Sequence, residues 1–364
     1  MNNHPETSFT NLISQRNTII CCGSGGVGKT TVAAAMALCG ATQGRKTCVV
    51  TVDPARRLAD ALGIGQLDNS PRKIEGPWPG ELWAVMLDTK GTFDELIRNY
   101  SSDQAQVESI LHNRLYKNLS GSFSGTQEYM AMEKLYELHS DSRFDFIVVD
   151  TPPTRNALDF LDAPRQLGRF LDNKIFRLLM MPARTYLKAV SVATRTFLRA
   201  ISKVVGAEVV ADAVAFFQAF EGLEQGFRDR AGKVESVLSD PSTAFVLMTS
   251  PRTEAVDEAM FFAKKLAESK MKVEGLVVNR VHPSFKLDNQ GPIDLAQLTT
   301  RVESQLGKDL LENWAQMNLM ADQEATHVRD LRAKVSPAPV VEIPLLDGDV
   351  HDLDSVRSIA SFLV

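Results

Sequence analysis

A glycine-rich segment near the N-terminus has the residue types and spacing of a phosphate-binding loop. Residues 23–30 read Gly-Ser-Gly-Gly-Val-Gly-Lys-Thr, which fits the pattern G-x-x-x-x-G-K-[ST]. The glycines let backbone N–H groups turn inward around a phosphate, and the start of the next helix adds partial positive charge. Lys29 is expected to reach the β- and γ-phosphates, and Thr30 to offer its hydroxyl to Mg²⁺. We therefore predict an ATP and Mg²⁺ site whose cofactor-binding residues include Gly23, Ser24, Gly25, Gly26, Val27, Gly28, Lys29, Thr30 and Thr31.

The sequence on both sides of the loop predicts the strand–loop–helix context that this motif requires. The apolar run Thr18–Cys22 before it is typical of a buried parallel strand, and an alanine-rich helix is predicted over Lys29–Gln43 after it. The alternative is a glycine-rich turn without a ligand, and the two flanks weigh against it.

Two aspartates follow predicted strands and are expected at the ligand edge of a parallel sheet. Asp53 could orient or deprotonate the attacking water, or hold a water of the Mg²⁺ shell, and Asp150 could face Mg²⁺ through water. A helix-capping role is the alternative for each, and Pro54 directly after Asp53 fits it. Together with the phosphate loop, the two aspartates favour the functional interpretation. We therefore predict Asp53 and Lys29 as catalytic residues. We predict a metal site formed by Thr30, Asp53 and Asp150.

The segments after two later strands predict contacts with the base. Asn279 follows the apolar run Val273–Val278, and an amide can donate to and accept from an adenine edge at once. Pro344 and Leu345 follow the last predicted strand and could close a base pocket with apolar atoms, although an ordinary strand end explains them equally well. The loop Thr-Pro-Pro-Thr at 151–154 is expected to change shape with the γ-phosphate.

Short apolar runs alternate with helical patterns, which predicts an α/β fold: a doubly wound, mostly parallel sheet flanked by helices. Between Asp150 and Ala244 the sequence is helical, so an inserted all-helical subdomain is expected. We predict an ATPase core of residues 1–154 and 241–364, a helical insert of residues 155–240 and a minor helical insertion of residues 290–334. The predicted strands are Thr18–Cys22, Thr47–Val52, Leu82–Leu87, Phe144–Val149, Ala244–Met248, Val273–Val278 and Val340–Ile343, and the predicted helices are Lys29–Gln43, Arg56–Leu62, Gly91–Tyr100, Gln104–Asn118, Gly125–Leu138 and Glu254–Ser269.

The insert contains a basic amphipathic segment. Residues 174–207 carry seven basic side chains and no acidic one, and from Arg184 onward the basic and apolar positions fall on separate helical stripes. Such a helix could cover an apolar groove, lie on an anionic membrane or bind an apolar peptide. A solvated cationic face on a packed helix is the alternative.

Composition narrows the class of protein. The chain has 364 residues, a net charge of −5 and a pI of about 5.8, so nothing suggests a nucleic-acid partner. The sequence contains no run of about 18 apolar residues, so no membrane span is predicted. Cys21, Cys22, Cys39 and Cys48 form no C-x-x-C pair, so we expect buried thiols in a reducing cytoplasm and no zinc.

These motifs together resemble the ArsA family of P-loop ATPases, which includes arsenite-pump ATPases and the guided-entry ATPase that delivers tail-anchored membrane proteins. The resemblance covers nearly the whole chain, and Asp-Pro-Ala at 53–55 is its most discriminating piece. It implies a homodimer or pseudodimer with two ATP sites facing each other. It also implies that Asp53 activates water, that Asp150 begins the second switch and that Asn279 reads adenine, while the insert forms an apolar client groove in the tail-anchored-protein carriers.

The sequence departs from the family pattern at several positions. Ser24 stands where the family usually has a lysine that crosses the dimer interface, as in a bacterial branch with Ser or Ala there. A lysine-bearing paralogue in a heterodimer, or Arg56 or Arg57, could supply that charge. Arg252 stands where a glutamate is often found 27 residues before the adenine-reading Asn, and we include it among the candidate cofactor-binding residues. The zinc cysteines and any insert cysteine for arsenite are absent, so an arsenite-pump subunit is not expected.

Three functions follow as hypotheses. The first is a cytoplasmic Mg-ATP-dependent dimeric switch, soluble or peripheral at the membrane, whose insert binds an apolar client or a membrane-protein partner. The second is a nucleotide-binding, weakly hydrolysing regulatory subunit of a heterodimer, which Ser24 motivates. The third is a positioning ATPase of the ParA/MinD type, which the large insert and the short C-terminal segment disfavour.

Overall fold

The computed structural model describes residues 8–52, 57–119, 126–152, 163, 165–169, 172, 206–220, 222–285, 302 and 304–364. Asp53, the Pro-Thr end of the loop at 151–154 and nearly all of the basic segment 174–207 lie outside the described residues. The predictions made for them, and for the bounds of the helical insert, therefore stay predictions.

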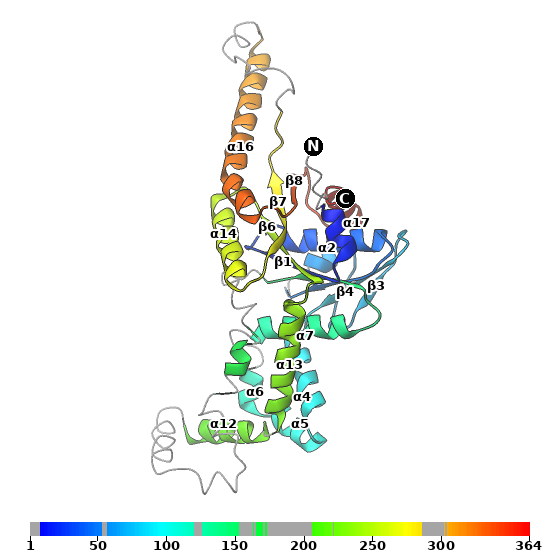
Figure 1. Cartoon of the computed structure of the whole chain (residues 1–364), viewed down its shortest axis with the longest axis vertical. Helices are drawn as coiled ribbons and strands as arrows, with labels where there is room; N and C mark the ends of the chain where they lie inside the picture. Colours follow the sequence, from blue (N-terminus) through cyan, green and yellow to red (C-terminus); the bar gives the residue numbers. More distant parts are fainter. Residues whose placement is uncertain are drawn as a thin grey trace.

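The described residues form an eight-stranded sheet in the order β3-β4-β2-β5-β1-β6-β7-β8 (Figure 1). β3 is antiparallel to β4, and the other neighbouring pairs are parallel. The predicted fold class is thereby confirmed. The strands are β1 Thr18–Gly23, β2 Lys46–Thr51, β3 Arg72–Ile74, β4 Glu81–Met86, β5 Phe146–Asp150, β6 Thr243–Thr249, β7 Val273–Val281 and β8 Val340–Pro344.

Helices cover both faces of the sheet, and each face has its own apolar core. On one face, α2 packs on β2 and β5 and is itself covered by α17, with α1 and α3 beside it. On the other face, α7, α14 and α16 pack against β5, β6 and β7. The helices of these layers are α1 Phe9–Gln15, α2 Lys29–Thr42, α3 Arg57–Ala61, α7 Thr126–Ser140, α14 Thr253–Glu268, α16 Gln305–Val335 and α17 Leu353–Ala360.

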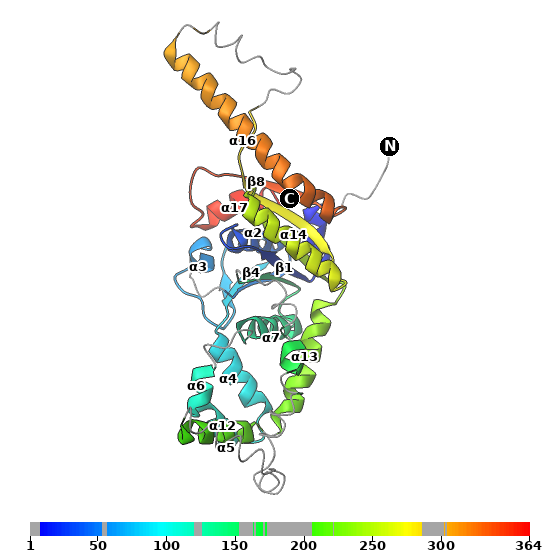
Figure 2. The ribbon, with the colours of Figure 1, turned by 90° about the vertical axis from the view of Figure 1, so that its left-hand side faces the viewer.

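Further helices among the described residues form a helical lobe beside α7, away from α16 (Figures 1 and 2). They are α4 Thr89–Tyr100, α5 Gln104–Leu111, α6 Arg114–Leu119, α12 Ala207–Ala219 and α13 Leu223–Leu238. Their contacts join chain segments far apart in sequence, since α12 packs on α5 and α6 and α13 packs on α4 and α7. Aromatic rings fill the space between them, including Phe93, Tyr116, Phe216, Phe220 and Phe227.

The structure confirms the predicted strands and most of the predicted helices, with bounds shifted by a few residues. The helix predicted over Gln104–Asn118 is wrong: it is two helices, because the chain turns at His112 and Asn113, after which the fully buried Tyr116 enters the core. The strand β3 and the helices α1 and α17 were not predicted from the sequence. They are three to eight residues long, too short for a clear periodic pattern.

The helix α16 is unusual for its length of 31 residues. Its C-terminal half packs on β7 and α14, and buries Val328, Leu331 and Val335. Its N-terminal half extends beyond the sheet as an arm (Figures 1 and 2). Among the described helices, none combines the length and the apolar character needed to cross a membrane.

Candidate nucleotide site

The phosphate loop connects β1 to α2, and its shape depends on glycine at two positions. Gly28 is the N-cap of α2 with a left-handed φ of 89°, and a Cβ there would lie 2.2 Å from Asn279 Nδ2. A Cβ on Gly23 would lie 2.2 Å from the Met248 carbonyl oxygen. The loop is therefore clamped between the ends of β6 and β7, and it leaves a backbone-lined cradle at the N-terminus of α2 that suits a phosphate.

Lys29 lies inside this loop rather than in solvent. Its side chain is buried, and Nζ donates hydrogen bonds to the carbonyl oxygens of Gly23 at 3.0 Å and Ser24 at 2.8 Å. A buried ammonium needs such acceptors to offset its lost hydration. The loop thus holds a fixed positive charge where phosphate oxygens are expected.

Asp150 and Thr30 meet at the sheet edge beneath the loop. The Asp150 carboxylate is buried, and its Oδ2 accepts hydrogen bonds from Thr30 Oγ1 at 2.7 Å and Thr51 Oγ1 at 2.8 Å. The register explains this meeting, because Asp150 at the end of β5 lies beside Cys21 of β1 and Thr51 of β2. Hydroxyl and carboxylate oxygens are the donors that Mg²⁺ prefers, so the residues present fit this ion.

Thr51 is a site residue that the sequence reasoning missed. Its hydroxyl fixes the Asp150 carboxylate from the strand opposite β1. The available signal was a polar residue directly after the apolar run Cys48–Val50, two positions before Asp53. Thr151 adds a similar brace, because its hydroxyl donates to the Cys21 carbonyl oxygen at 2.7 Å.

Asn279 ties β7 to the phosphate loop. Its Nδ2 donates to the Val27 carbonyl oxygen at 2.9 Å, and its Oδ1 accepts from the Arg280 backbone N–H at 2.9 Å. An amide has two donor hydrogens and two acceptor lone pairs, so half of this capacity remains for a base edge. The predicted base-reading residue therefore also positions the loop.

A cleft of about 1420 Å³ runs from the phosphate loop to the ends of β6, β7 and β8. It brings together residues that the sequence placed in four separate segments. Lys29, Thr30 and Asp150 lie beneath the loop and are not among its lining residues, and Asp53 is outside the described residues. The predicted site residues that line the cleft are Ser24, Gly25, Gly26, Val27, Gly28, Thr31, Arg252, Asn279, Pro344 and Leu345.

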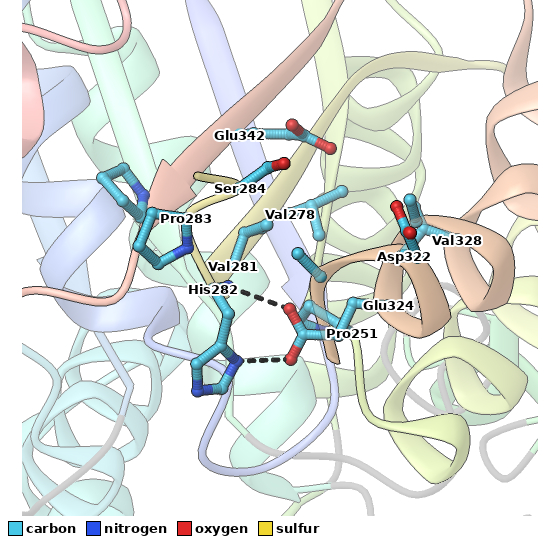
Figure 3. Close-up of a pocket in the computed structure, with 13 residues that line it drawn as sticks. Pro251, Val278, Val281, His282, Pro283, Ser284, Asp322, Glu324, Val328 and Glu342 are labelled. Carbon is cyan, nitrogen blue, oxygen red and sulfur yellow. Dashed lines mark hydrogen bonds and ion pairs between the residues drawn. The ribbon is translucent and has the colours of Figure 1, made fainter. Parts of the chain in front are cut away.

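A second, smaller cavity of about 330 Å³ adjoins the cleft between β7, β8 and α16 (Figure 3). Its wall includes Val278, Val281 and Val328. Glu324 of α16 and His282 also line it and are in direct contact: Glu324 accepts from the His282 backbone N–H at 2.9 Å and contacts Nδ1 at 2.6 Å. These contacts anchor α16 to the end of the strand that carries Asn279.

The four cysteines lie in β1, α2 and β2 and are buried, as predicted for small apolar side chains. Burial raises the pKa of each thiol, to about 12 for Cys39. Thiolates are therefore scarce at neutral pH, which makes these side chains poor nucleophiles.

The parallel sheet, the phosphate loop with its buried lysine and the threonine–aspartate pair define a P-loop nucleotide hydrolase. Residues 16–364 match the ArsA ATPase family model, which is described as anion-transporting ATPase. The chain belongs to the ArsA family of ATPases.

Relatives of this family resemble the chain along most of its length. The Aquifex aeolicus protein named "Putative arsenical pump-driving ATPase 1" is 24% identical over 95% of this chain and 78% of its own length. The ATPases GET3B and GET3C of Arabidopsis thaliana are 28% and 27% identical, over 73% and 76% of this chain. The alignments cover 64% of GET3B and 70% of GET3C, so the chain spans just under two thirds of the GET3B sequence.

Proposed function

We propose that this ATPase is a Mg-ATP-dependent dimeric switch that acts in the cytoplasm, or peripherally at a membrane. Hydrolysis would gate the binding of an apolar client or a membrane-protein partner through the helical insert. The observation that carries the nucleotide half of this proposal is the hydrogen-bonded group of Thr30, Thr51 and Asp150 beneath the phosphate loop.

The residues around the nucleotide would work by positioning and charge neutralisation, because phosphoryl transfer asks for little covalent chemistry from protein. Lys29 and the loop amides would bind phosphate oxygens, and Thr30 and Asp150 would hold Mg²⁺. When bound, Mg²⁺ supplies charge neutralisation at the phosphates. Asp53 would align the attacking water, a role that its place after β2 and the family resemblance support.

The client half of the proposal is supported by the helical lobe. Its helices come from residues 89–119 and 207–238 and lie beside α7, which leads directly into β5 and Asp150. Since α7 packs against both β5 and α13, a shift of β5 could be transmitted to the lobe through α7. The resemblance to the tail-anchored-protein carriers of the ArsA family makes a protein client the preferred partner.

Two measurements test this function on the purified full-length protein. ATP turnover should be measurable in the wild type and should fall at least ~100-fold in Asp53→Asn. Light scattering should give twice the chain mass with ATP bound to Asp53→Asn, and less with ADP. A protein that neither binds nor hydrolyses ATP would exclude the proposal.

Ser24 favours a second candidate, a regulatory subunit that hydrolyses weakly alone. Its side chain is uncharged and buried within the loop, so it cannot reach a partner's phosphates as a lysine would. Mass measurement of the complex isolated from cells, with and without ATP, would then find a paralogous subunit. Ser24→Lys should raise basal turnover, and unchanged turnover would count against this candidate.

A further inference from the structure

Arg280 occupies an unusual place in the sheet. It lies between Asn279, which pairs with Ile343, and Val281, which pairs with Pro344, so the β7–β8 register shifts at Arg280. Such a bulge turns the side chain of the extra residue in a new direction, and bulges are frequent beside active sites.

The backbone at Arg280 is also strained. Its φ is +62°, in the left-handed region that glycine adopts freely and that a long side chain adopts at a cost. A glycine would form this bulge without strain. Strain of this kind persists where the surrounding structure imposes it, and it is concentrated at ligand-binding sites.

The bulge places the Arg280 guanidinium over the phosphate loop. Its Nη1 donates to the Gly26 carbonyl oxygen at 3.3 Å, and the residue is exposed and lines the nucleotide cleft. Among the described residues, the Gly26 carbonyl is the hydrogen-bond acceptor found for this side chain. A guanidinium has five N–H donors in a planar fork, so most of its donor capacity is available to a ligand in the cleft.

We propose that Arg280 binds the phosphate chain of the nucleotide from the open side of the cleft, opposite Lys29. This assignment presupposes the ATP binding of the proposed function. A phosphate oxygen is an anionic acceptor, and a charge-assisted hydrogen bond to it is stronger than the long bond to the neutral Gly26 carbonyl. The guanidinium therefore exchanges one acceptor for the other as nucleotide enters, with little movement of the backbone.

The test compares two variants that relieve the same kind of backbone strain. Arg280→Gly removes the guanidinium and retains the backbone N–H that Asn279 accepts. Lys270→Gly is the matched control, because Lys270 has a φ of +61° and is exposed in the turn before β7, outside the lining of the cleft. Chemical unfolding of both variants should show midpoints equal to or above that of the wild type.

Titration calorimetry of the full-length protein then separates the outcomes. In Arg280→Gly, ATP and ADP should bind about tenfold more weakly, whereas adenosine measured by competition should stay within about twofold. Arg280→Lys should recover part of the loss, and Lys270→Gly should bind ATP as the wild type does.

Equal ATP affinity in Arg280→Gly and Lys270→Gly would overturn the assignment. Equal losses for ATP and adenosine would overturn it as well, since they would indicate a displaced Asn279. Failure of the wild type to bind ATP would instead exclude the proposed function.

Discussion

The residues that line the nucleotide cleft lie in short motifs at strand ends. In the helical lobe, by contrast, the packing contacts join helices that are about a hundred residues apart in the chain. The cleft relies on backbone groups and on a few side chains held by the sheet register. The lobe relies on aromatic packing, and an ion pair from Arg230 to the buried Glu133 joins it to α7. Under the proposed function, chemistry would therefore be confined to residues with little freedom to vary in type, and partner recognition to a part whose apolar core can be repacked.

Asp150→Asn should produce the largest effect, because it weakens the oxygen site at the sheet edge. ATP turnover should fall about 1000-fold, or ~4 kcal/mol in transition-state free energy. Asp145→Asn is the control just before β5, where the carboxylate is exposed and contacts Arg45. A similar loss in both variants would contradict a specific role for the C-terminal end of this strand.

In the lobe, Arg230→Met should destabilise the fold by ~3 kcal/mol, since it leaves the buried Glu133 without the arginine that it pairs with. Burial raises the pKa of Glu133 above its ordinary value of 4.5, and Arg230 partly offsets this rise. A carboxyl whose folded-state pKa is raised binds its proton more tightly when folded. Stability should therefore fall as pH rises from about 4.5, and more steeply in the variant.

Urea unfolding at pH 5 and pH 8 would check this expectation. Arg230→Met combined with Glu133→Gln should recover stability and flatten the pH dependence. ATP binding by Arg230→Met, measured at low urea, should be close to that of the wild type. If Arg230→Met lost as much turnover as Asp150→Asn, the lobe and the cleft would be coupled more tightly than their packing indicates.

Gly28→Ala should weaken ATP binding about 30-fold, or ~2 kcal/mol, because the new Cβ strains the left-handed backbone and displaces Asn279. Gly44→Ala separates the two causes, since Gly44 has a φ of 88° with open space around it. Its unfolding free energy should fall by about 1 kcal/mol with ATP affinity unchanged. Calorimetry and urea unfolding of both variants give the comparison.

Arg252→Ala should have the smallest effect. The side chain is exposed at the start of α14 and lines the cleft, so ATP affinity should fall about threefold at low salt and less at high salt. Arg329→Ala, on the exposed face of α16, is the control. No difference between the two would remove Arg252 from the nucleotide site.

The difference between cleft and lobe also explains what could be predicted from sequence. The position of residues 23–30 between a strand and a helix, and of Asp150 at the end of β5, could be predicted because the spacing encodes the loop and parallel strands end at one sheet edge. Their roles toward ATP stay predictions. Thr51 was missed because its role arises from the neighbouring strand β5, which lies a hundred residues away in sequence. Arg280 was missed as a site residue because a left-handed bulge leaves no mark in the residue types.

In the lobe, the packing contacts could not be predicted from the sequence. Tyr116 is fully buried beside Phe216, yet neither position stands out in the sequence. Packing of this kind depends on which helices meet, and many apolar arrangements satisfy the same pattern.

The arm formed by α16 has a consequence for handling the protein in solution. Thirty-one helical residues at a rise of 1.5 Å span about 46 Å, and the N-terminal part of the helix extends past the sheet at the end away from the lobe (Figure 2). An elongated particle diffuses more slowly than a sphere of equal mass. A single chain should thus elute earlier from a sizing column than a compact chain of equal mass, so the proposed nucleotide-dependent pairing should be followed by a direct mass measurement.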